Sequence, residues 1–440
     1  MDEGRARVII VGAGFGGLNA AKTLANSPLQ VSILDKHNYH LFQPLLYQVA
    51  TSSLSATDIS YPVRAIFRKQ ENVRFRLTEV EHIDLDAKIV YTSTGPMEYD
   101  YLILAVGGET NYFGLESVMK HGRGLKDLQD SITIRNHILR TFELSTQEQD
   151  SQVCQALRTF VVVGGGPTGV EFAGALSELI RLVLSKDFPE LDFSDVRVII
   201  LEMTERLLVG FPEDLAQKAA EELRAKHVEI HFGARVSDYD GKRVLLDSGE
   251  EIPAFTLVWA AGVKACSLVD TLGVQQASKG RLVVEPTLQL PGHPEVFVVG
   301  DAAFLEQDGE PLPMLAPVAI QQAKQAARNI LHLQAGRPPQ PFQYDDPGSM
   351  ATIGRNVAVA RVGGFKFHGF LAWLVWLGVH LVWLIGFRNR LLVLINWAAD
   401  YLFYERAMRL ITPDGALNAK TAPWELEPEH PQPVKEPVDE

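Results

Sequence analysis

Residues 7–18 read RVIIVGAGFGGL, and this stretch decides the fold. Val8 to Val11 is a run of apolar β-forming residues, which predicts a buried strand. Gly12, Gly14 and Gly17 follow with the spacing G-x-G-x-x-G and lead into small residues that favour a helix. The first glycine permits a tight turn, the second lets the backbone approach a pyrophosphate, and the third lets the helix pack on the strand. The stretch therefore predicts a strand–turn–helix unit that binds a dinucleotide.

An acidic residue follows at the distance that this unit requires. The apolar run Val31–Leu34 ends in Asp35, roughly 20 residues after the glycines. A carboxylate at this strand end accepts hydrogen bonds from the hydroxyls of a ribose. Strand, glycines, helix and acid together favour a dinucleotide site over a glycine-rich turn in an ordinary β-α-β unit.

The whole pattern occurs a second time. The repeat consists of an apolar strand, three glycines with the same spacing, a helix, a second strand and an acid: Thr159–Val163; Gly164, Gly166 and Gly169; Val170–Leu184; Arg197–Leu201; Glu202. The acid lies further from its glycines than usual because Lys186–Asp195 is an insertion. Two such units in one chain predict two nucleotides bound together, one held permanently and one exchanged.

Glu202 also indicates which nucleotide the second unit binds. Its carboxylate would hydrogen-bond the 2′-hydroxyl of a ribose and repel a 2′-phosphate. Arg206 is close, but no arginine occupies the strand end itself. The sequence therefore favours NAD over NADP.

The composition is that of a globular protein with two or three domains. The chain has 440 residues, of which 46% are hydrophobic, and its net charge of −13 argues against a general nucleic-acid binder. Its two cysteines, Cys154 and Cys266, form no C-x-x-C pair, which excludes a dithiol redox motif, and we predict no metal site. Because the residues before Arg7 resemble neither a signal peptide nor a transit peptide, we expect the protein to stay in the compartment where it is made.

Further strands end in glycines that suit a ligand site. Three strands are followed by such residues: Tyr99–Val106 by Gly107 and Gly108, Phe255–Ala261 by Gly262, and Glu295–Val299 by Gly300 and Asp301. Met314–Leu333 has a helical pattern, with Pro317 in its first turn. We expect a loop over His37–Tyr47 and a turn at Thr94–Pro96.

The composition changes after Gly363. Residues 369–387 read GFLAWLVWLGVHLVWLIGF and contain no formally charged side chain. Aromatic residues spaced three and four apart share one face of a helix here: Trp373, Trp376, His380, Trp383 and Phe387. Because tryptophan favours the interface between membrane and water, we interpret this aromatic stripe as a membrane-facing surface.

A second apolar helix is expected over Leu391–Leu410, with Asn389, Asn396 and Asp400 on one side. From residue 366 to residue 411 there are five Lys or Arg and two Asp or Glu, a local charge of 5 − 2 = +3. This local reversal in an acidic chain favours anionic lipid headgroups.

Three arrangements of these helices compete. A membrane-spanning hairpin would place Asn396 and Asp400 in hydrocarbon, which is costly. A buried dimer interface is the alternative for a soluble protein. We favour a pair of helices that lies in one leaflet of the membrane. Residues 412–440, rich in proline and acidic residues, are expected to be disordered.

At this point the sequence resembles a known family, the type II NADH:quinone oxidoreductases, also called alternative NADH dehydrogenases. The stretches that carry the resemblance are VGAGFGGL, HLFQPLLYQVA, YDYLILAVGGETNYFG, VVVGGGPTGVEFAGAL, VWAAGV, VFVVGDAA, LAPVAIQQA, ATIGRNVAVA and HLVWLIGFRNR. They extend to about residue 411. Related disulfide reductases and sulfide:quinone reductases use cysteine pairs that this chain lacks.

The resemblance implies an α/β fold with two Rossmann-like dinucleotide-binding domains, as in glutathione reductase, and a C-terminal helical membrane-anchoring region. An FAD-binding domain would comprise residues 1–122 and 265–350, and an NADH-binding domain residues 123–264. Residues 351–411 would form the membrane-associating domain.

The resemblance also assigns roles to individual residues. FAD would lie on Gly12, Gly14, Gly16 and Gly17, with Asp35 at its adenosine ribose, Asp301 at its ribitol or pyrophosphate, and Ala316 and Val318 near the flavin ring. NADH would contact Gly164, Gly166, Thr168, Gly169 and Glu202. Further cofactor contacts are implied at Phe15, Lys36, Val80, Gly107, Pro167 and Gly262.

Glu171 would be the family's glutamate beside the nicotinamide and flavin, with a role in catalysis or relay. The alternative is a glutamate stabilised by the helix dipole. Gln321, Gln322 and Lys366 match positions associated with the quinone. Pro317 replaces the first glutamine of the family's A-Q-x-A-x-Q-Q pattern, which leaves open which polar group meets the quinone carbonyl. A solvated helix face is the other interpretation of the two glutamines.

By this resemblance, NADH would pass a hydride to FAD, and a membrane quinone (menaquinone or ubiquinone) would accept two electrons in a respiratory chain without proton pumping. We expect a peripheral, monotopic protein at the cytoplasmic side of a prokaryotic cell membrane, on anionic lipid, and a homodimer is compatible with this. Two alternatives stay open: a reductase of a soluble electron carrier, and an apoptosis-type redox-sensing flavoprotein.

Overall fold

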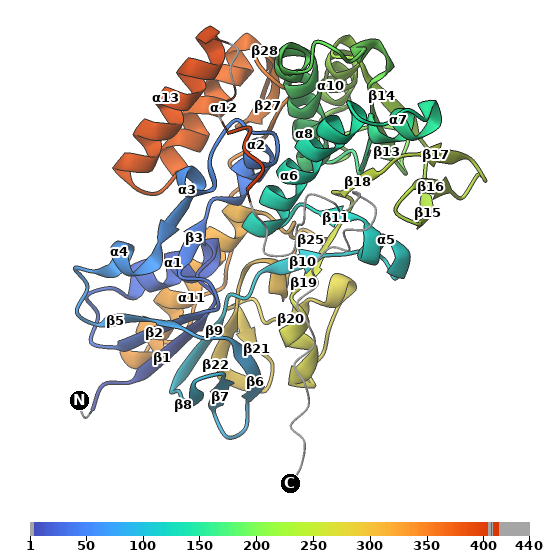
Figure 1. The fold of residues 1–440 in the computed structure, drawn as a ribbon. Helices are drawn as coiled ribbons and strands as arrows, with labels where there is room; N and C mark the ends of the chain where they lie inside the picture. Colours follow the sequence, from blue (N-terminus) through green and yellow to red (C-terminus); the bar gives the residue numbers. More distant parts are fainter. Residues whose placement is uncertain (1–3, 404–405, 407, 413–440) are drawn as a thin grey trace.

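The structure, a computed structural model, describes residues 4–403, 406 and 408–412. The lower part of Figure 1 is built on a six-stranded sheet with the order β21-β22-β9-β1-β2-β5. Its strands are β1 (Arg7–Val11), β2 (Gln30–Asp35), β5 (Val73–Leu77), β9 (Tyr101–Leu104), β21 (Gln289–Leu290) and β22 (His293–Val298). All pairs are parallel except β21 with β22. This sheet therefore joins two separate parts of the sequence.

A second, wholly parallel sheet has the order β11-β18-β12-β13-β14. Its strands are β11 (Arg123–Gly124), β12 (Thr159–Val163), β13 (Arg197–Glu202), β14 (Val228–Phe232) and β18 (Thr256–Trp259). In both sheets the strand before the glycines is central, and its side chains, such as Ile10 and Val162, are completely buried. Near-continuous apolar runs suit such strands because helices cover parallel sheets on both faces. The prediction of two Rossmann-like units is confirmed.

Helices follow the glycine turns as expected. α1 (Phe15–Leu24) and α11 (Ala316–Gln334) lie side by side against the first sheet (Figure 1). α8 (Pro167–Glu178) and α10 (Glu213–Ala225) pack against the second. The expected helix Val170–Leu184 continues beyond α8 as a π-helical turn, Leu179–Leu184. α6 (Leu128–Ser145) packs on the short helix α2 (Leu46–Ala50) and so connects the two units.

Three of the smaller sheets among the described residues are three-stranded and antiparallel. They comprise β6 (Val80–Asp84), β7 (Ile89–Thr92) and β8 (Gly95–Glu98); β15 (Val236–Tyr239), β16 (Arg243–Leu246) and β17 (Glu251–Pro253); and β26 (Ser349–Thr352), β27 (Ala358–Val362) and β28 (Phe365–Gly369). The turn expected at Thr94–Pro96 ends earlier than predicted. Gly95 already belongs to β8, where it pairs with Thr92 of β7. The expected loop His37–Tyr47 contains β3 (Tyr39–Leu41), which pairs with β4 (Ser60–Pro62).

The last two helices lie at the upper left of Figure 1, beside β27 and β28. They are α12 (Phe370–Trp383) and α13 (Phe387–Phe403). The first helix is therefore shorter than the expected range 369–387, and the second begins before Leu391, where we expected its start. Arg390 explains the break: its guanidinium donates to the carbonyls of Val382 and Leu384, both at 2.7 Å. A basic side chain on the last carbonyls of a helix stabilises its end.

Only Trp383 and Phe387 of the aromatic stripe face outward as we expected, and the rest of the stripe faces the protein. Trp376 is 1% exposed, His380 stacks on it with ring centroids 4.0 Å apart, and Trp373 packs on Tyr401. The outward surface consists instead mainly of aliphatic and phenylalanine side chains: Phe370, Leu371, Leu374, Val382, Trp383, Phe387, Leu391, Leu394, Ile395, Leu402 and Phe403. We call these residues the outer apolar face. α12 is apolar on all sides, so spacing alone could not tell its inner face from its outer one.

The polar residues of α13 share one side, as predicted, and that side faces the protein. The amide of Asn389 donates to the carbonyls of Thr57 and Ser60, at 3.2 and 3.0 Å. Asn396 donates to a carboxylate oxygen of Asp58 at 3.0 Å. These contacts attach α13 to α3 (Ala56–Ile59) and the start of β4 and satisfy polar groups that would otherwise be buried without partners.

Within the described residues, no helix combines the length and the apolar character needed to cross a membrane. No group of three or more His, Cys, Asp or Glu in this same part of the chain could hold a metal ion. The segment expected to be disordered, residues 412–440, lies outside the described residues except for Thr412, whose backbone N–H donates to Asn136.

Candidate active site

The first glycine turn is held in shape by Asp35. One carboxylate oxygen accepts from the backbone N–H of Ala13 at 2.6 Å and the other from that of His37 at 2.7 Å. Gly12 has φ +100°, and a Cβ there would lie 2.3 Å from the carbonyl oxygen of Ala105. A Cβ on Gly17 would lie 1.8 Å from the Gly12 carbonyl oxygen. The turn therefore requires glycine at these places.

The second turn repeats this construction. Glu202 accepts from the backbone N–H groups of Gly165 at 2.6 Å and Thr204 at 2.8 Å. A Cβ on Gly169 would lie 1.9 Å from the carbonyl oxygen of Gly164. Glu202 is further from its glycines in sequence than Asp35 is, yet it holds its turn by the same kind of contact with a backbone N–H group.

Both turns open onto free space at the same glycine. A Cβ on Gly14 or on Gly166 would have no atom within 4 Å. In each turn the space beside this glycine is thus open, as close approach of a pyrophosphate to the backbone requires. Contact of these residues with a nucleotide stays a prediction.

The surroundings of the first turn fit FAD. His40 is buried, its Nδ1 lies 2.9 Å from the Ala13 carbonyl, and its Nε2 has no partner among the described residues. Burial lowers the pKa of His40 to about 4, so the neutral ring donates through Nδ1 and keeps Nε2 as a free acceptor. Asp301 pairs with Lys126 at 3.2 Å and lies beside Gly108. An open glycine turn, an unused acceptor and this carboxylate suit a flavin dinucleotide.

The other predicted cofactor residues lie near the two turns. Phe15 starts α1 and packs edge-on against His40 and Phe42, while Gly16 packs against Val299. Lys36 follows Asp35, Gly107 follows β9, Val80 begins β6, and Ala316 and Val318 lie in the first turn of α11. Pro167 and Thr168 begin α8, and a Cβ on Gly262 would touch the ring of Phe113.

The three residues predicted to face the quinone are not brought together. Gln322 is 1% exposed and accepts from the backbone N–H of Gly300 at 2.7 Å. The amide of Gln321 exchanges two hydrogen bonds with the backbone of Asp345. Lys366 pairs with Asp214 at 3.1 Å on the surface. Their contact with a quinone stays a prediction.

A cavity of about 100 Å³ lies beneath the two C-terminal helices. Its apolar lining consists of Tyr47, Ala175, Leu182, Val183, Gly354, Trp373, Trp376, Leu377, Trp397 and Tyr401, and its polar lining of Gln48, Ser53, Glu178, Thr352, Arg355, Asp400 and Arg406. Sequence reasoning missed this site. Its residues come from five separate segments, which no spacing in the sequence relates to one another.

Glu171 lies directly behind the wall of this cavity. Its Oε1 accepts from the backbone N–H of Thr352 at 3.3 Å and from the indole N–H of Trp376 at 3.2 Å, and both of these residues line the cavity. The side chain is buried, and burial raises the pKa of Glu171 to about 8. At neutral pH it is therefore mostly a carboxylic acid, which can donate a proton.

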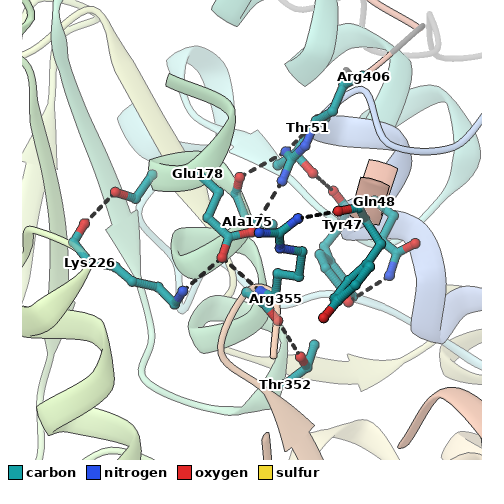
Figure 2. A network of polar contacts seen from close by, with 12 residues as sticks. Tyr47, Gln48, Thr51, Ala175, Glu178, Lys226, Thr352, Arg355 and Arg406 are labelled. Carbon is teal, nitrogen blue, oxygen red and sulfur yellow. Dashed lines mark hydrogen bonds and ion pairs between the residues drawn. The ribbon is translucent and has the colours of Figure 1, made fainter. Parts of the chain in front are cut away.

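Glu178, Arg355 and Arg406, which line the cavity, belong to a network of polar contacts (Figure 2). Glu178 accepts from Lys226 at 2.7 Å and from the backbone N–H of Arg355 at 2.7 Å, and Arg406 lies 3.5 Å away. The buried guanidinium of Arg406 also donates to the carbonyls of Thr51 and Ala175. The positive charge of Arg406 is therefore paired with the carboxylate of Glu178 inside the protein. It does not face anionic lipid headgroups, contrary to our interpretation of the local positive charge.

Known proteins show the same architecture. Residues 6–323 match the family model described as pyridine nucleotide-disulphide oxidoreductase, and residues 347–405 match the NDH2 C-terminal domain. The structure of NDH2 from Plasmodium falciparum in complex with NADH superimposes with a TM-score of 0.86 at 20% identity and covers 93% of this chain and 100% of that chain. Sulfide:quinone oxidoreductase from Aquifex aeolicus gives 0.70 at 18% identity, with 90% and 95% covered. At these identities the likeness concerns the fold.

Sequence comparison is more specific. The chain is 41% identical to the type II NADH:quinone oxidoreductase Ndh of Mycobacterium tuberculosis, with 93% of this chain and 90% of the relative covered. It is 29% identical to the type II NADH:quinone oxidoreductase of Staphylococcus aureus strain NCTC 8325, with 84% and 92% covered. With two glycine turns, the C-terminal domain and this identity along the chain, the protein belongs to the type II NADH:quinone oxidoreductase family.

Proposed function

We propose that the first glycine turn holds FAD, the second holds NADH, and the cavity beneath α12 and α13 receives the head group of a quinone. The protein is an FAD-dependent oxidoreductase that transfers two electrons from NADH to quinone. The observation that carries the placement of the quinone is a buried glutamate, hydrogen-bonded to Trp376, behind a cavity lined by aromatic rings. We assign the flavin to residues 1–122 and 265–350 and NADH to residues 123–264.

Binding and orientation are the first task of the protein. Asp35 and Glu202 already hold their turns through backbone N–H groups, so little reordering is needed when a nucleotide binds. FAD, when bound, supplies the redox chemistry that connects NADH to the quinone. The carboxylate of Glu202 disfavours a 2′-phosphate and thus selects NADH over NADPH.

Proton transfer is the second task. Quinol formation consumes two electrons and two protons, and the hydride of NADH brings two electrons and one proton. The other proton must come from water through groups of the protein. Glu171 can deliver it because burial keeps its carboxyl protonated at neutral pH. Trp376 and Leu377 supply apolar walls against which a flat ring can lie.

Filling the cavity tests its assignment. Leu182 lines the cavity and is partly exposed, so Leu182→Trp adds volume there without burying a polar group. We expect the KM for a short-chain quinone to rise by about tenfold or more, because the larger ring occupies the binding space. Reduction of ferricyanide by NADH should be unchanged, since this one-electron acceptor needs no such cavity. Steady-state kinetics with both acceptors measures the difference.

Leu77→Trp is the matched control, because Leu77 is an exposed leucine on the edge strand β5, in the other part of the fold. Equal KM values for quinone in Leu182→Trp and Leu77→Trp would contradict the assignment. A wild-type protein that reduces ferricyanide but no quinone would contradict the proposed function itself.

The outer apolar face is the membrane contact in this proposal. Leu371 is 63% exposed and Phe387 is 82% exposed, and they belong to different helices of this face. Large contiguous apolar surfaces of this kind mark membrane or protein contacts. We propose that the outer apolar face inserts into one leaflet, with Arg388 and Arg390 near anionic headgroups. This leaflet is on the side of the membrane where NADH is available.

Two charges on this face should remove membrane binding. Transfer of one leucine-sized side chain from water into hydrocarbon contributes about 1.5–3 kcal/mol, and a charged residue reverses that gain. Leu371→Glu with Phe387→Glu should therefore lower the fraction bound to sedimented anionic vesicles by about tenfold or more, while activity with a short-chain quinone persists. Leu77→Glu controls for an added surface charge. Undiminished vesicle binding by the double variant would contradict the proposal.

A further inference from the structure

A second carboxyl group, that of Asp400, reaches the cavity from α13. It lies on the protein-facing side of this helix, together with Asn389 and Asn396. Both asparagines bond to α3 and the start of β4 and hold the helix, whereas Asp400 lines the cavity next to Gln48, Trp397 and Tyr401 and accepts a hydrogen bond from Ser53. Burial of an acid is costly, so its position at the cavity points to a chemical task.

The proposed reaction needs a route for protons to this cavity. The overall balance is NADH + H⁺ + quinone → NAD⁺ + quinol, so each turnover takes one proton from water. Glu171 is only 8% exposed and is enclosed by Thr352 and Trp376. After it donates a proton it must be recharged by a group in closer contact with water. Asp400 is half-buried and is the other cavity carboxyl besides Glu178, which Lys226 holds in an ion pair.

We propose that Asp400 takes up protons from water and passes them into the quinone cavity, where they recharge Glu171 or reach the quinone oxygen directly. This inference rests on the proposed function of the cavity. Polar groups of the same cavity lining are joined by hydrogen bonds: the amide N–H of Gln48 donates to the hydroxyl of Tyr47 at 2.8 Å, and its carbonyl oxygen accepts from the indole N–H of Trp397 at 2.7 Å.

The surroundings keep Asp400 able to bind and release a proton. Burial raises its pKa, whereas Arg406, a hydrogen bond from Ser53, Arg355 and Arg409 lower it, with a net result of about 7. Arg406 is tied to Glu178 and to two backbone carbonyls, so its charge is already partly compensated (Figure 2). Both the protonated and the ionised form of Asp400 are therefore populated near neutral pH, as a proton relay requires.

The test compares acceptors that differ in their need for protons. In the full-length holoenzyme, Asp400→Asn should lower turnover with a short-chain quinone by about tenfold or more at pH 7–8. Ferricyanide takes up electrons but no proton, so its reduction by NADH should be unchanged. The bleaching of the flavin absorbance by NADH without acceptor should also be unchanged. Asp400→Glu should restore most of the quinone turnover.

Asp247→Asn serves as the control, because Asp247 is an exposed carboxylate paired with Arg235 at 3.6 Å in the NADH-binding part. The flavin content and melting temperature of each variant are compared with the wild type. Equal losses with quinone and ferricyanide would show a structural role and overturn the proposal, as would wild-type quinone turnover in Asp400→Asn.

Ser53→Ala provides a second measurement that does not depend on the stability of Asp400→Asn. Loss of a hydrogen bond that favours the ionised carboxylate raises its pKa. The part of the decline in quinone turnover near pH 7, where Asp400 loses its proton, should therefore move upward, with no change for ferricyanide. An unmoved profile would count against the relay. Failure of the proposed function would look different, because the wild type would then reduce no quinone at any pH.

Discussion

Glu171→Gln is expected to reduce quinone turnover by about 10²-fold at neutral pH and to leave ferricyanide reduction by NADH close to the wild-type rate. Glutamine has the same shape and can keep the contacts with Thr352 and Trp376, but it has no acidic proton. Positioned general acids contribute about 10²–10⁴-fold to rates. Stopped-flow kinetics that separates flavin reduction from reoxidation by quinone measures the effect.

The pH dependence of this variant follows from the same group. Because burial raises the pKa of Glu171 to about 8, the proton-donating form is lost as the pH rises through 8. Wild-type quinone turnover should decline there, and the decline should be absent from the residual activity of Glu171→Gln. A variant with wild-type turnover and an unchanged pH profile would exclude Glu171 as the acid.

Glu171 should also affect how the free energy of unfolding depends on pH. The folded state keeps the proton that the unfolded chain releases above its ordinary pKa near 4.5, so burial of Glu171 makes the protein lose stability as the pH rises from 4.5 to 8. The slope is up to about 1.4 kcal/mol per pH unit for one proton. Glu171→Gln should remove this part of the pH dependence of the melting temperature.

The second large effect is expected at the open glycines. A Cβ on Gly14 or Gly166 meets no protein atom, so alanine at either position should fold normally and obstruct only the nucleotide. Gly14→Ala should yield folded protein largely free of flavin. Gly166→Ala should retain flavin and show an NADH KM raised by about tenfold or more, because backbone contact with the pyrophosphate is lost.

Flavin absorbance per protein and NADH titrations distinguish the two variants. Gly169→Ala is the contrasting change, since its Cβ would lie 1.9 Å from the Gly164 carbonyl oxygen and must distort the turn. It should lower the melting temperature as well as NADH affinity. Loss of flavin from Gly166→Ala together with retention by Gly14→Ala would reverse our assignment of the two nucleotides.

The glycine turns could be predicted from sequence because most of their requirements are local. Gly17 and Asp35 are fixed by contacts within one β-α-β unit, as are Gly169 and Glu202 in the repeat, and only Gly12 and Gly164 also meet a neighbouring strand end from elsewhere in the chain. The cavity could not be predicted in this way. Tyr47, Thr352, Trp376 and Arg406 come together only when both units and the C-terminal helices have packed.

The aromatic stripe shows a second limit of prediction from sequence. The spacing of Trp373, Trp376 and His380 correctly predicts that they share one face of a helix, but it does not predict that this face points into the protein. In a soluble helix the polar side marks the exterior, whereas α12 has no charged side chain on either side. The interior of the protein favoured the large rings, which fill space against Tyr401 and Trp397, and left aliphatic side chains outside.

The pair α12 and α13 forms both the outer apolar face and one wall of the cavity. In the proposed membrane-bound state, a quinone dissolved in the bilayer would reach the cavity without passing through water. The occupancy of the cavity then depends on the number of quinone molecules per unit area of membrane, and not on their number per volume of solution. The turnover of such an enzyme would fall when the membrane grows without quinone synthesis, because the amount of quinone per unit area of membrane then falls.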